Sequence, residues 1–265
     1  MESEHPEAHG LARGFPADRA ALVVYLMAGY PDRATSLAAL HAAARAGADV
    51  IELGVPYGDP LADGPVIAEA AKVARESGFG LAESIDLAAE FLASAGASAP
   101  PVALMTYLNP LMRMGPPQAA MAMRDAGVGG VIVPDMPPEA ARPWLAASAG
   151  LDTVFLVAPT STPERLTTVG AASAGFVYCV STTGVTGERA QLSAELGELV
   201  SRAKEHTHLP VAVGFGVSEP SQAAEVARIA DGVVVGSAIV RRQRDPQEVG
   251  EFVGALAKAV HSART

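Results

Sequence analysis

A single carboxylate interrupts an apolar run in the stretch VIELGVP, which begins at Val50. Side chains alternate between the two faces of a β-strand, so Ile51 and Leu53 face one side and Glu52 faces the other. Burial of an unpaired carboxylate disfavours its charged form and raises its pKa toward the range of a general acid or base. A salt bridge is the alternative, but no Lys or Arg lies on a predicted strand before Arg241, at the far end of the last one. We therefore predict that Glu52 carries out acid–base chemistry.

Three more carboxylates lie at or just after predicted strand ends, namely Asp59, Asp63 and Asp135. In LADGPVIAEA, the order Asp-Gly-Pro before a helical run is as typical of a helix N-cap region as of a functional carboxylate, so both interpretations of Asp63 stay open. Asp59 and Asp135 each lie beside a proline, and for both a turn residue is the better interpretation. As a set, these groups are suited to general acid–base catalysis.

The tyrosines share one kind of position relative to the predicted strands. Ordinary core packing would explain one or two of them, but all five fall in predicted strands or just after them: Tyr25, Tyr30, Tyr57, Tyr107 and Tyr178. This bias predicts a pocket that accepts a flat apolar group and offers hydroxyls.

Histidine and lysine are absent from the predicted strand ends. All six His fall in the N-terminal tail, in predicted helices, before the seventh strand or at the C-terminus, which argues against a catalytic triad or a His-based metal site. Lys72, Lys204 and Lys258 lie in predicted helices, so a Schiff-base lysine inside the fold is excluded if the strand assignments hold. The single Cys179 rules out an internal disulfide and a multi-cysteine metal site. We therefore expect no metal site built on His or Cys and no catalytic lysine.

The elements that must position these residues alternate along the chain. Short β-branched runs alternate with Ala-rich segments of helical periodicity, as in successive βα units. Eight strands are predicted, at 21–29, 50–56, 101–110, 130–135, 152–159, 176–182, 210–216 and 232–240. Helices are predicted at 36–47, 65–78, 81–96, 138–150, 193–206 and 220–230, with Gly78 and Gly80 separating the second from the third.

The 265 residues suit one (β/α)8 TIM barrel, a fold of about 250 residues. We expect a single barrel domain at 21–262 after an N-terminal extension, 1–20, that is partly flexible or helical. A doubly wound sheet is the second choice. In a barrel, the chemistry lies at the carboxyl ends of the strands.

Three glycine-containing stretches follow the last three predicted strands. They are TTGVTG ending at Gly187, GFG at 214–216, and VGSAIV with Gly236 and Ser237. Glycines let backbone amides approach an anion, and the loops after strands seven and eight are the recurrent phosphate position in such barrels. Apart from Arg189, no Lys or Arg accompanies them, so we expect backbone amides and a helix dipole to hold a phosphate.

The composition limits the classes of partner that the protein can bind. The net charge of −10, without a basic cluster, argues against nucleic acid and anionic membranes as partners. The N-terminus lacks the features of a signal peptide, and no apolar run reaches the roughly 18 residues of a membrane span. We expect a cytoplasmic protein.

With these residues in place, the chain from about Ala21 to about Val240 resembles the tryptophan synthase alpha subunit family. The motifs that carry the resemblance are ELGVPYGDPLADGP, LMTYLNP, VIVPDMPP, LVAPTST, STTGVTG, VAVGFG and DGVVVGSAIV, each at the end of its predicted strand. The resemblance implies a TIM barrel that cleaves indole-3-glycerol phosphate to indole and glyceraldehyde 3-phosphate by a retro-aldol reaction, without metal or organic cofactor. It also implies a partner, the tryptophan synthase beta subunit, in an alpha2beta2 complex.

The resemblance assigns roles residue by residue. Glu52 is similar to the family's proton-shuttling glutamate, and Asp63 to the aspartate that binds the indole N–H. The implied substrate-binding residues are Tyr25, Met105, Tyr107, Ile132, Tyr178 and Thr186. The implied phosphate cradle is Gly187, Phe215, Gly216, Gly236 and Ser237. Asp59 and Pro60 fall in a loop through which family members sense their beta subunit.

Three departures from the family pattern bear on the partner more than on the chemistry. Gly58 stands where a Ser or Thr is usual, Thr182 where many members have Arg, and Tyr30 where Asp is common. Three alternatives to a lyase that supplies indole to a beta subunit stay open. The first is a stand-alone lyase that releases free indole, and the second is a weakly active subunit that activates a beta partner. The third is another phosphosugar enzyme on the same barrel.

Overall fold

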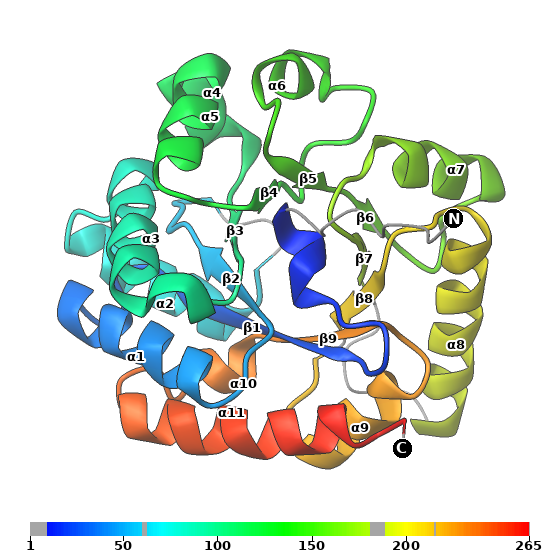
Figure 1. The fold of residues 1–265 in the computed structure, drawn as a ribbon. Helices are drawn as coiled ribbons and strands as arrows, with labels where there is room; N and C mark the ends of the chain where they lie inside the picture. The colour runs from blue at the N-terminus through cyan, green and yellow to red at the C-terminus, as the bar shows by residue number, and fades with distance from the viewer. Residues whose placement is uncertain (1–9, 60–62, 181–188, 215, 265) are drawn as a thin grey trace, which may run out of the picture.

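The computed structural model describes residues 10–59, 63–180, 189–214 and 216–264, and places a ring of parallel strands inside a layer of helices (Figure 1). This arrangement confirms the predicted TIM barrel. The strands are β1 Ala21–Met27, β2 Val50–Gly54, β3 Val102–Met105, β4 Gly130–Ile132, β5 Asp152–Val154, β6 Leu156–Val157, β7 Val177–Val180, β8 Val211–Gly214 and β9 Gly232–Val235.

Nine strand segments occupy the eight predicted positions, because the fifth predicted strand is divided at Phe155. Its first part, β5, pairs with β4, and its second part, β6, pairs with β7. The Phe155 carbonyl accepts a hydrogen bond from the Tyr178 amide, and the Thr153 carbonyl accepts one from the Ala174 amide. These bonds join the two ends of the sheet across the division.

The predicted position at which the eighth strand ends, residue 240, is wrong. The strand β9 stops at Val235, and Ser237–Val240 forms the short helix α10. The end of the third predicted strand also differs, since β3 stops at Met105 and the helix α4 begins at Leu108. In both places an apolar run continues past the carboxyl edge of the sheet, and hydrophobicity alone does not distinguish a strand from a buried helix.

The helices surround the barrel, and the first, predicted from residue 36, begins at Arg33. Asp32 accepts a hydrogen bond from the Thr35 amide, 2.8 Å away, at the start of the first helix. The predicted division at Gly78 and Gly80 is confirmed, and Gly78 has a φ of +87°. The helices are α1 Arg33–Arg45, α2 Pro65–Glu76, α3 Leu81–Ala95, α4 Leu108–Met114, α5 Pro116–Asp125, α6 Arg142–Ala147, α7 Pro163–Ala172, α8 Arg189–Glu205, α9 Pro220–Ala227, α10 Ser237–Val240 and α11 Pro246–His261, with 3-10 turns η1 Gly10–Gly14 and η2 Gly96–Ser98. Among them, no described helix combines the length and the apolar character that crossing a bilayer needs.

Alternation along the strands divides the core into two parts. Ile51 and Leu53 pack in the large cluster between the sheet and the helices. Val50 packs in a second cluster inside the barrel, with Ala103 and Phe176. Glu52 therefore points to the barrel interior, as the alternation predicted.

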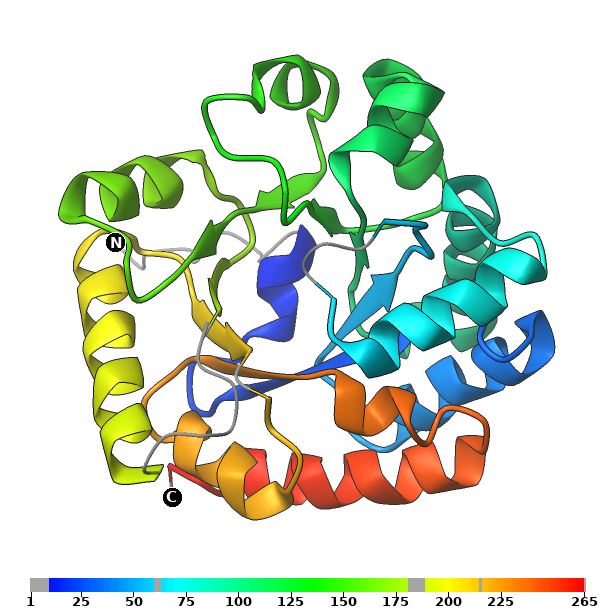
Figure 2. The same cartoon turned by 180° about the vertical axis from the view of Figure 1, so that it is seen from behind.

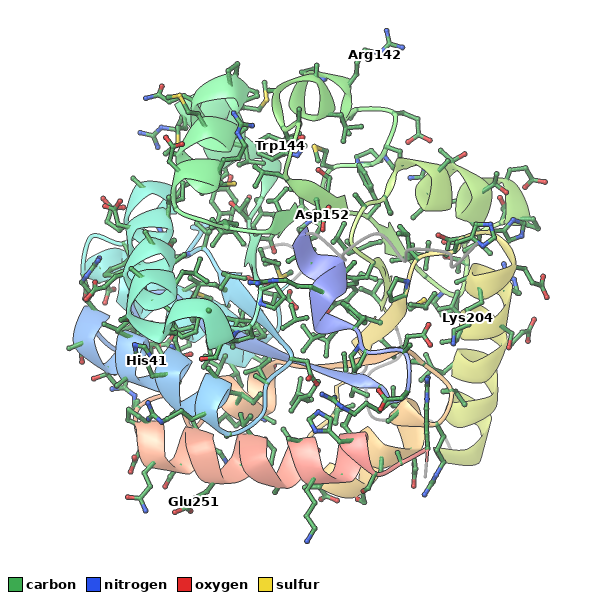
Figure 3. The ribbon with its side chains drawn as sticks, viewed as in Figure 1. His41, Arg142, Trp144, Asp152, Lys204 and Glu251 are labelled. Atoms are coloured by element: carbon green, nitrogen blue, oxygen red, sulfur yellow. The ribbon has the colours of Figure 1, made fainter. Side chains whose placement is uncertain are left out.

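The amino-terminal end of the barrel is closed by η1, which lies across its centre in Figure 1. Leu11 is fully buried inside the barrel, and its amide donates a 2.7 Å hydrogen bond to Asp152 at the start of β5 (Figure 3). Gly10 has a φ of +65° and lies so close to Asp152 that a side chain there would collide with the carboxylate. With this end closed, the open end of the barrel is the one at the carboxyl ends of the strands.

Candidate active site

Glu52 lies in β2, between its register partners Tyr25 in β1 and Ala103 in β3. Its side chain is almost completely buried, with 1% of the residue exposed. Within the described part of the chain, its Oε2 atom has no hydrogen-bond partner. Burial, and to a smaller extent the nearby Asp63, raises the pKa of Glu52 to about 8. At neutral pH this carboxyl group is therefore mainly protonated.

Asp63 is the second carboxylate of the site. The N-cap of α2 is Gly64, with no side-chain cap, so Asp63 is not the capping residue that the sequence left possible. Burial raises the pKa of Asp63 to about 6, and a hydrogen bond with the Tyr107 side chain opposes that rise. At neutral pH Asp63 is mainly ionised, so the two carboxyl groups can play different roles.

Both carboxyl groups line a cavity of about 560 Å³ at the carboxyl ends of the strands. Figure 2 shows this end of the barrel, with α2 in cyan and α10 in orange. The structure brings together nine of the predicted residues in its lining: Tyr25, Glu52, Asp63, Met105, Ile132, Tyr178, Gly216, Gly236 and Ser237. Thr186, Gly187, Phe215 and Pro60 lie outside the described residues, as does Thr182.

The tyrosines divide into groups. Tyr25 and Tyr178 line the cavity, and burial raises the pKa of both hydroxyls well above 10, so they stay neutral hydrogen-bonding groups. Tyr107 is buried and contacts Asp63. Tyr57 and Tyr30 lie outside this cavity: Tyr57 stacks on Tyr107 with ring centroids 5.0 Å apart, and Tyr30 lies against Arg244.

Two glycines make room for the cavity tyrosines. A Cβ on Gly54 would lie 2.0 Å from the Tyr25 hydroxyl oxygen, and one on Gly214 would lie 2.4 Å from that of Tyr178. Neither glycine has a positive φ, so close approach of the rings, rather than backbone conformation, requires them. No sequence pattern indicates these contacts, because they join neighbouring strands.

Arg241 is a lining residue that sequence reasoning missed. The expectation that no Arg except Arg189 accompanies the glycine stretches is therefore wrong. The reason is the helix α10, which carries Arg241 at its C-cap instead of on a strand. Leu156, Val180 and Val217 are further lining residues, and only the apolar ends of their strands could have indicated them.

The described lining contains no His, Lys or Cys. Within the described chain, no group of three or more His, Cys, Asp or Glu is placed to hold a metal ion. Cys179 is buried in the core, and burial raises the pKa of its thiol to about 12. Among the described lining residues, Glu52 and Asp63 are the groups that can exchange protons near neutral pH.

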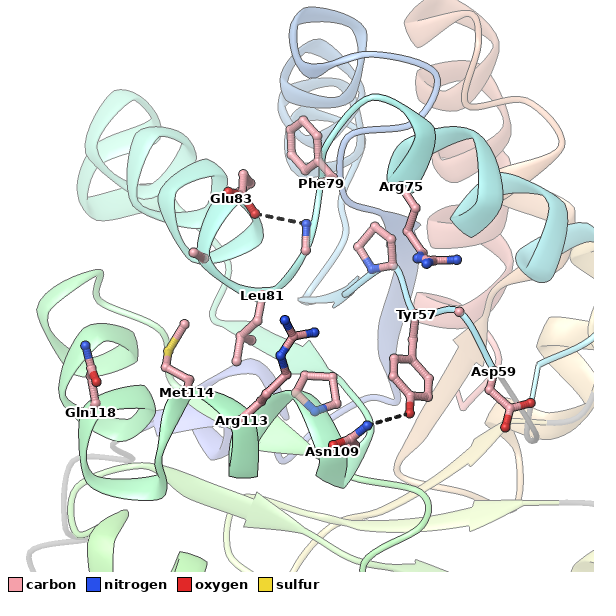
Figure 4. A pocket seen from close by; sticks show the side chains of 15 residues that line it. Tyr57, Asp59, Arg75, Phe79, Leu81, Glu83, Asn109, Arg113, Met114 and Gln118 are labelled. Atoms are coloured by element: carbon pink, nitrogen blue, oxygen red, sulfur yellow. Dashed lines mark hydrogen bonds between the residues drawn. The ribbon is translucent and has the colours of Figure 1, made fainter.

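A groove of about 760 Å³ lies between the loop after β2, the start of α3 and α4 (Figure 4). Tyr57 lies on its wall, where its hydroxyl accepts a 3.1 Å hydrogen bond from Asn109. Arg75 and Arg113 line the same groove, which we call the Arg75 groove, and Asp59 lies exposed at its edge. Asp135 has a structural role near it: its carboxylate accepts a hydrogen bond from the Leu108 amide at the start of α4.

Gly58 lies against Arg75 in this groove. A Cβ on Gly58 would lie 2.8 Å from a terminal nitrogen of Arg75. A Ser or Thr at position 58 would have to displace that guanidinium group. Because the Arg75 side chain is exposed and flexible, it can move aside, and this contact alone does not require a glycine.

The sequence model of the tryptophan synthase alpha chain family matches residues 12–261. The chain belongs to this family. It is 48% identical over 225 residues to the tryptophan synthase alpha chain of Mycobacterium avium, covering 84% of this chain and 82% of that one. It is 45% identical over 244 residues to the alpha chain of Chloroflexus aurantiacus, covering 91% of each.

Solved structures agree with this membership. A structure of Mycobacterium tuberculosis tryptophan synthase superposes with a TM-score of 0.88 at 43% identity, covering 96% of this chain and 99% of that one. The tryptophan synthase alpha subunit of Legionella pneumophila superposes with a TM-score of 0.81 at 32% identity, covering 91% of this chain and 92% of that one. The resemblance to the tryptophan synthase alpha family inferred from the motifs is confirmed.

Proposed function

We propose that this protein cleaves indole-3-glycerol phosphate to indole and glyceraldehyde 3-phosphate, with Glu52 as general acid and base and Asp63 as the indole-binding carboxylate. Family membership supports the reaction. The observation that carries the assignment is the pair of carboxyl groups in one cavity, with a pKa of about 8 for Glu52 and about 6 for Asp63. Between these two values, one group is protonated and the other is ionised.

This division of protonation states suits a retro-aldol cleavage. Protonated Glu52 donates its proton to C3 of the indole ring, and ionised Asp63 accepts a hydrogen bond from the indole N–H, where positive charge develops. Glu52, now a carboxylate, takes the proton of the glycerol hydroxyl on the carbon attached to C3. The bond between that carbon and C3 breaks, its electron pair restores the aromatic indole, and the carbon becomes the aldehyde of glyceraldehyde 3-phosphate. Glu52 ends the cycle protonated.

The rest of the cavity suits the two ends of this substrate. Tyr25, Met105 and Ile132 offer flat and apolar surface near the carboxyl groups, as an indole ring requires. Gly216, Gly236 and Ser237 line the cavity from the loop after β8 and the start of α10. Their backbone amides are candidates to bind the phosphate group, because a glycine backbone can approach an anion closely. Gly216 has a φ of +55°, a conformation that favours glycine.

A tryptophan synthase beta subunit is the proposed protein partner, with the Arg75 groove as part of the contact surface. Asp59 lies at the edge of this groove, in the loop that the family resemblance assigns to partner sensing. Tyr57, on the groove wall, stacks on Tyr107, which in turn contacts Asp63. A partner that shifts Tyr57 would therefore act on the site through two aromatic rings.

The rate of indole release from indole-3-glycerol phosphate, with and without an added beta subunit, tests these proposals. We expect a low rate alone that rises strongly in the complex. A high and unchanged rate would instead identify a stand-alone lyase. Absence of cleavage under both conditions would contradict the proposed reaction.

A further inference from the structure

Three arginines follow α10 in the run RRQR, and they differ in their contacts. Arg242 donates a 2.6 Å hydrogen bond to the Ala238 carbonyl and lies 4.0 Å from the centroid of the Phe252 ring. Arg244 donates a 2.9 Å hydrogen bond to the Tyr30 hydroxyl. The Arg241 side chain is exposed and lines the active-site cavity, and its guanidinium group forms no ion pair or hydrogen bond with another described residue. Of the three, Arg241 is the one available to a ligand.

The backbone directs Arg241 toward the side of the cavity that Ser237 lines. Its amide donates a 3.1 Å hydrogen bond to the Ser237 carbonyl, and its φ and ψ of −57° and −28° continue the helix. Residues four apart lie on one face of a helix, and side chains lean toward the helix N-terminus. The Arg241 side chain therefore extends along the face that carries Ser237.

Among the described lining residues, Arg241 alone offers an anion a counter-charge. The other carboxyl or basic side chains in the described lining are Glu52, which is mainly neutral at pH 7, and Asp63, which is mainly ionised, and the whole chain has a net charge of −10. A phosphate ester entering this cavity meets repulsion from Asp63 and from the surrounding field. Within the described lining, Arg241 is the single cation that opposes this repulsion.

We propose that Arg241 is a substrate-binding residue that attracts the phosphate group of the substrate and holds it next to Ser237. This inference rests on the proposed function and adds a cationic side chain to the backbone amides. A guanidinium group offers several N–H donors in a planar fork that matches phosphate oxygens. Because the phosphate is remote from the bond that breaks, Arg241 contributes to binding and not to the chemical step.

Substitution of Arg241 by Gln tests the inference in two independent measurements. We expect the Kd for glycerol 3-phosphate, measured by calorimetry, to rise about tenfold, as loss of a partly exposed charge-assisted contact implies. We expect the KM for indole-3-glycerol phosphate to rise by a similar factor while kcat stays within about twofold. The Kd for indole, which carries no phosphate, should not change. Arg241→Lys, which keeps the charge, should restore much of the affinity.

Arg244→Gln is the matched control, because it removes the same charge from the same run at a residue outside the cavity lining. We expect Arg244→Gln to leave the Kd for glycerol 3-phosphate and the KM for indole-3-glycerol phosphate unchanged. The effect of Arg241→Gln on both constants should shrink as salt is added. Equal affinities of the Arg241→Gln variant and the unaltered protein for glycerol 3-phosphate would overturn the inference and leave the proposed reaction standing. An unaltered protein that neither binds glycerol 3-phosphate nor releases indole would overturn the proposed function itself.

Discussion

Carboxylates lie at both ends of this barrel, but their surroundings differ. At the amino-terminal end, Asp49 accepts hydrogen bonds of 2.9 and 2.7 Å from Arg19, one of 2.8 Å from the Leu22 amide, and lies 2.8 Å from His261. At the carboxyl end, Glu52, three residues along the chain from Asp49, has an oxygen without a partner among the described residues. The two ends of one strand thus serve different purposes.

Asp231, also at the amino-terminal end, follows the pattern of Asp49. Burial raises the pKa of its carboxyl group, but Lys204, the Val211 amide and Arg264 together reverse that effect, and the net pKa is lowered. Asp152 is intermediate: burial raises its pKa, and the hydrogen bond from Leu11 only partly opposes this. The satisfied carboxylates at this end contribute to stability, whereas Glu52 at the other end, with one oxygen unsatisfied among the described residues, is held ready to exchange protons.

The largest expected effect comes from Glu52→Gln, which removes the proton-exchanging group and keeps its shape. We expect indole release to fall by about 10²- to 10⁴-fold, as loss of a general acid and base implies. The melting temperature at pH 7 should not fall, because Glu52 is mainly neutral there. Near-normal indole release by this variant would show that Glu52 is not the catalytic group.

Asp49→Ala should have the opposite effects, lowering stability while leaving indole release almost unchanged. It leaves Arg19 and the Leu22 amide without their acceptor in a largely buried position, so we expect a loss of about 3 kcal/mol in the free energy of unfolding. Indole release by the folded fraction should stay within about twofold, since Asp49 lies at the end of the barrel opposite the site. Denaturant unfolding measures the loss.

Glu90→Ala is the matched control for that experiment. Glu90 pairs with Arg33 at the exposed surface, so its loss should cost under about 1 kcal/mol. Similar losses for Asp49→Ala and Glu90→Ala would contradict a special role for the carboxylates at the amino-terminal end.

The two carboxyl groups should set a pH range in which kcat/KM is highest. Outside that range, kcat/KM should fall about tenfold per pH unit. Activity should fall below about pH 6, where Asp63 becomes protonated and loses its acceptor, and above about pH 8, where Glu52 loses the proton it donates. Stability should respond differently. Because the pKa of Glu52 is raised on folding, its contribution is complete below about pH 4.5 and declines as pH rises toward about 8.

The same linkage predicts that Glu52→Gln gains stability relative to the unaltered protein as pH rises from 5 to 9. Melting temperatures of both proteins across this range measure the effect. A constant difference would mean that Glu52 has an ordinary pKa, and would remove the distinction between the two ends of β2.

Asp152→Asn should have the smallest effect. The amide oxygen of Asn can still accept the hydrogen bond from Leu11, and the change removes a charge that burial disfavours. We expect a change within about 1 kcal/mol in the free energy of unfolding and unaltered indole release. A loss as large as that of Asp49→Ala would place Asp152 among the fully satisfied carboxylates.

The sequence predicted much of the fold because the barrel depends on local periodicity. The run around Glu52 has a two-residue alternation that the structure reproduces, and Gly78 and Gly80 separate α2 from α3 as predicted. Prediction from the sequence failed where a strand and a buried helix share the same hydrophobic pattern. The apolar run at 237–240 suits a strand or a buried helix equally well, and its position past the edge of the sheet decided for the helix α10.

What the sequence determined by itself is which residues could do chemistry. Glu52 in an apolar strand, the tyrosines near strand ends and the glycines of the loops follow from alternation and residue type alone. The tertiary structure decided how those residues are combined. It placed Tyr107 against Asp63, fitted Gly54 under Tyr25, and turned Arg241 into the cavity. Such contacts join segments far apart in the chain, and burial, which sets the pKa of Glu52, belongs to the packed barrel and not to any one strand.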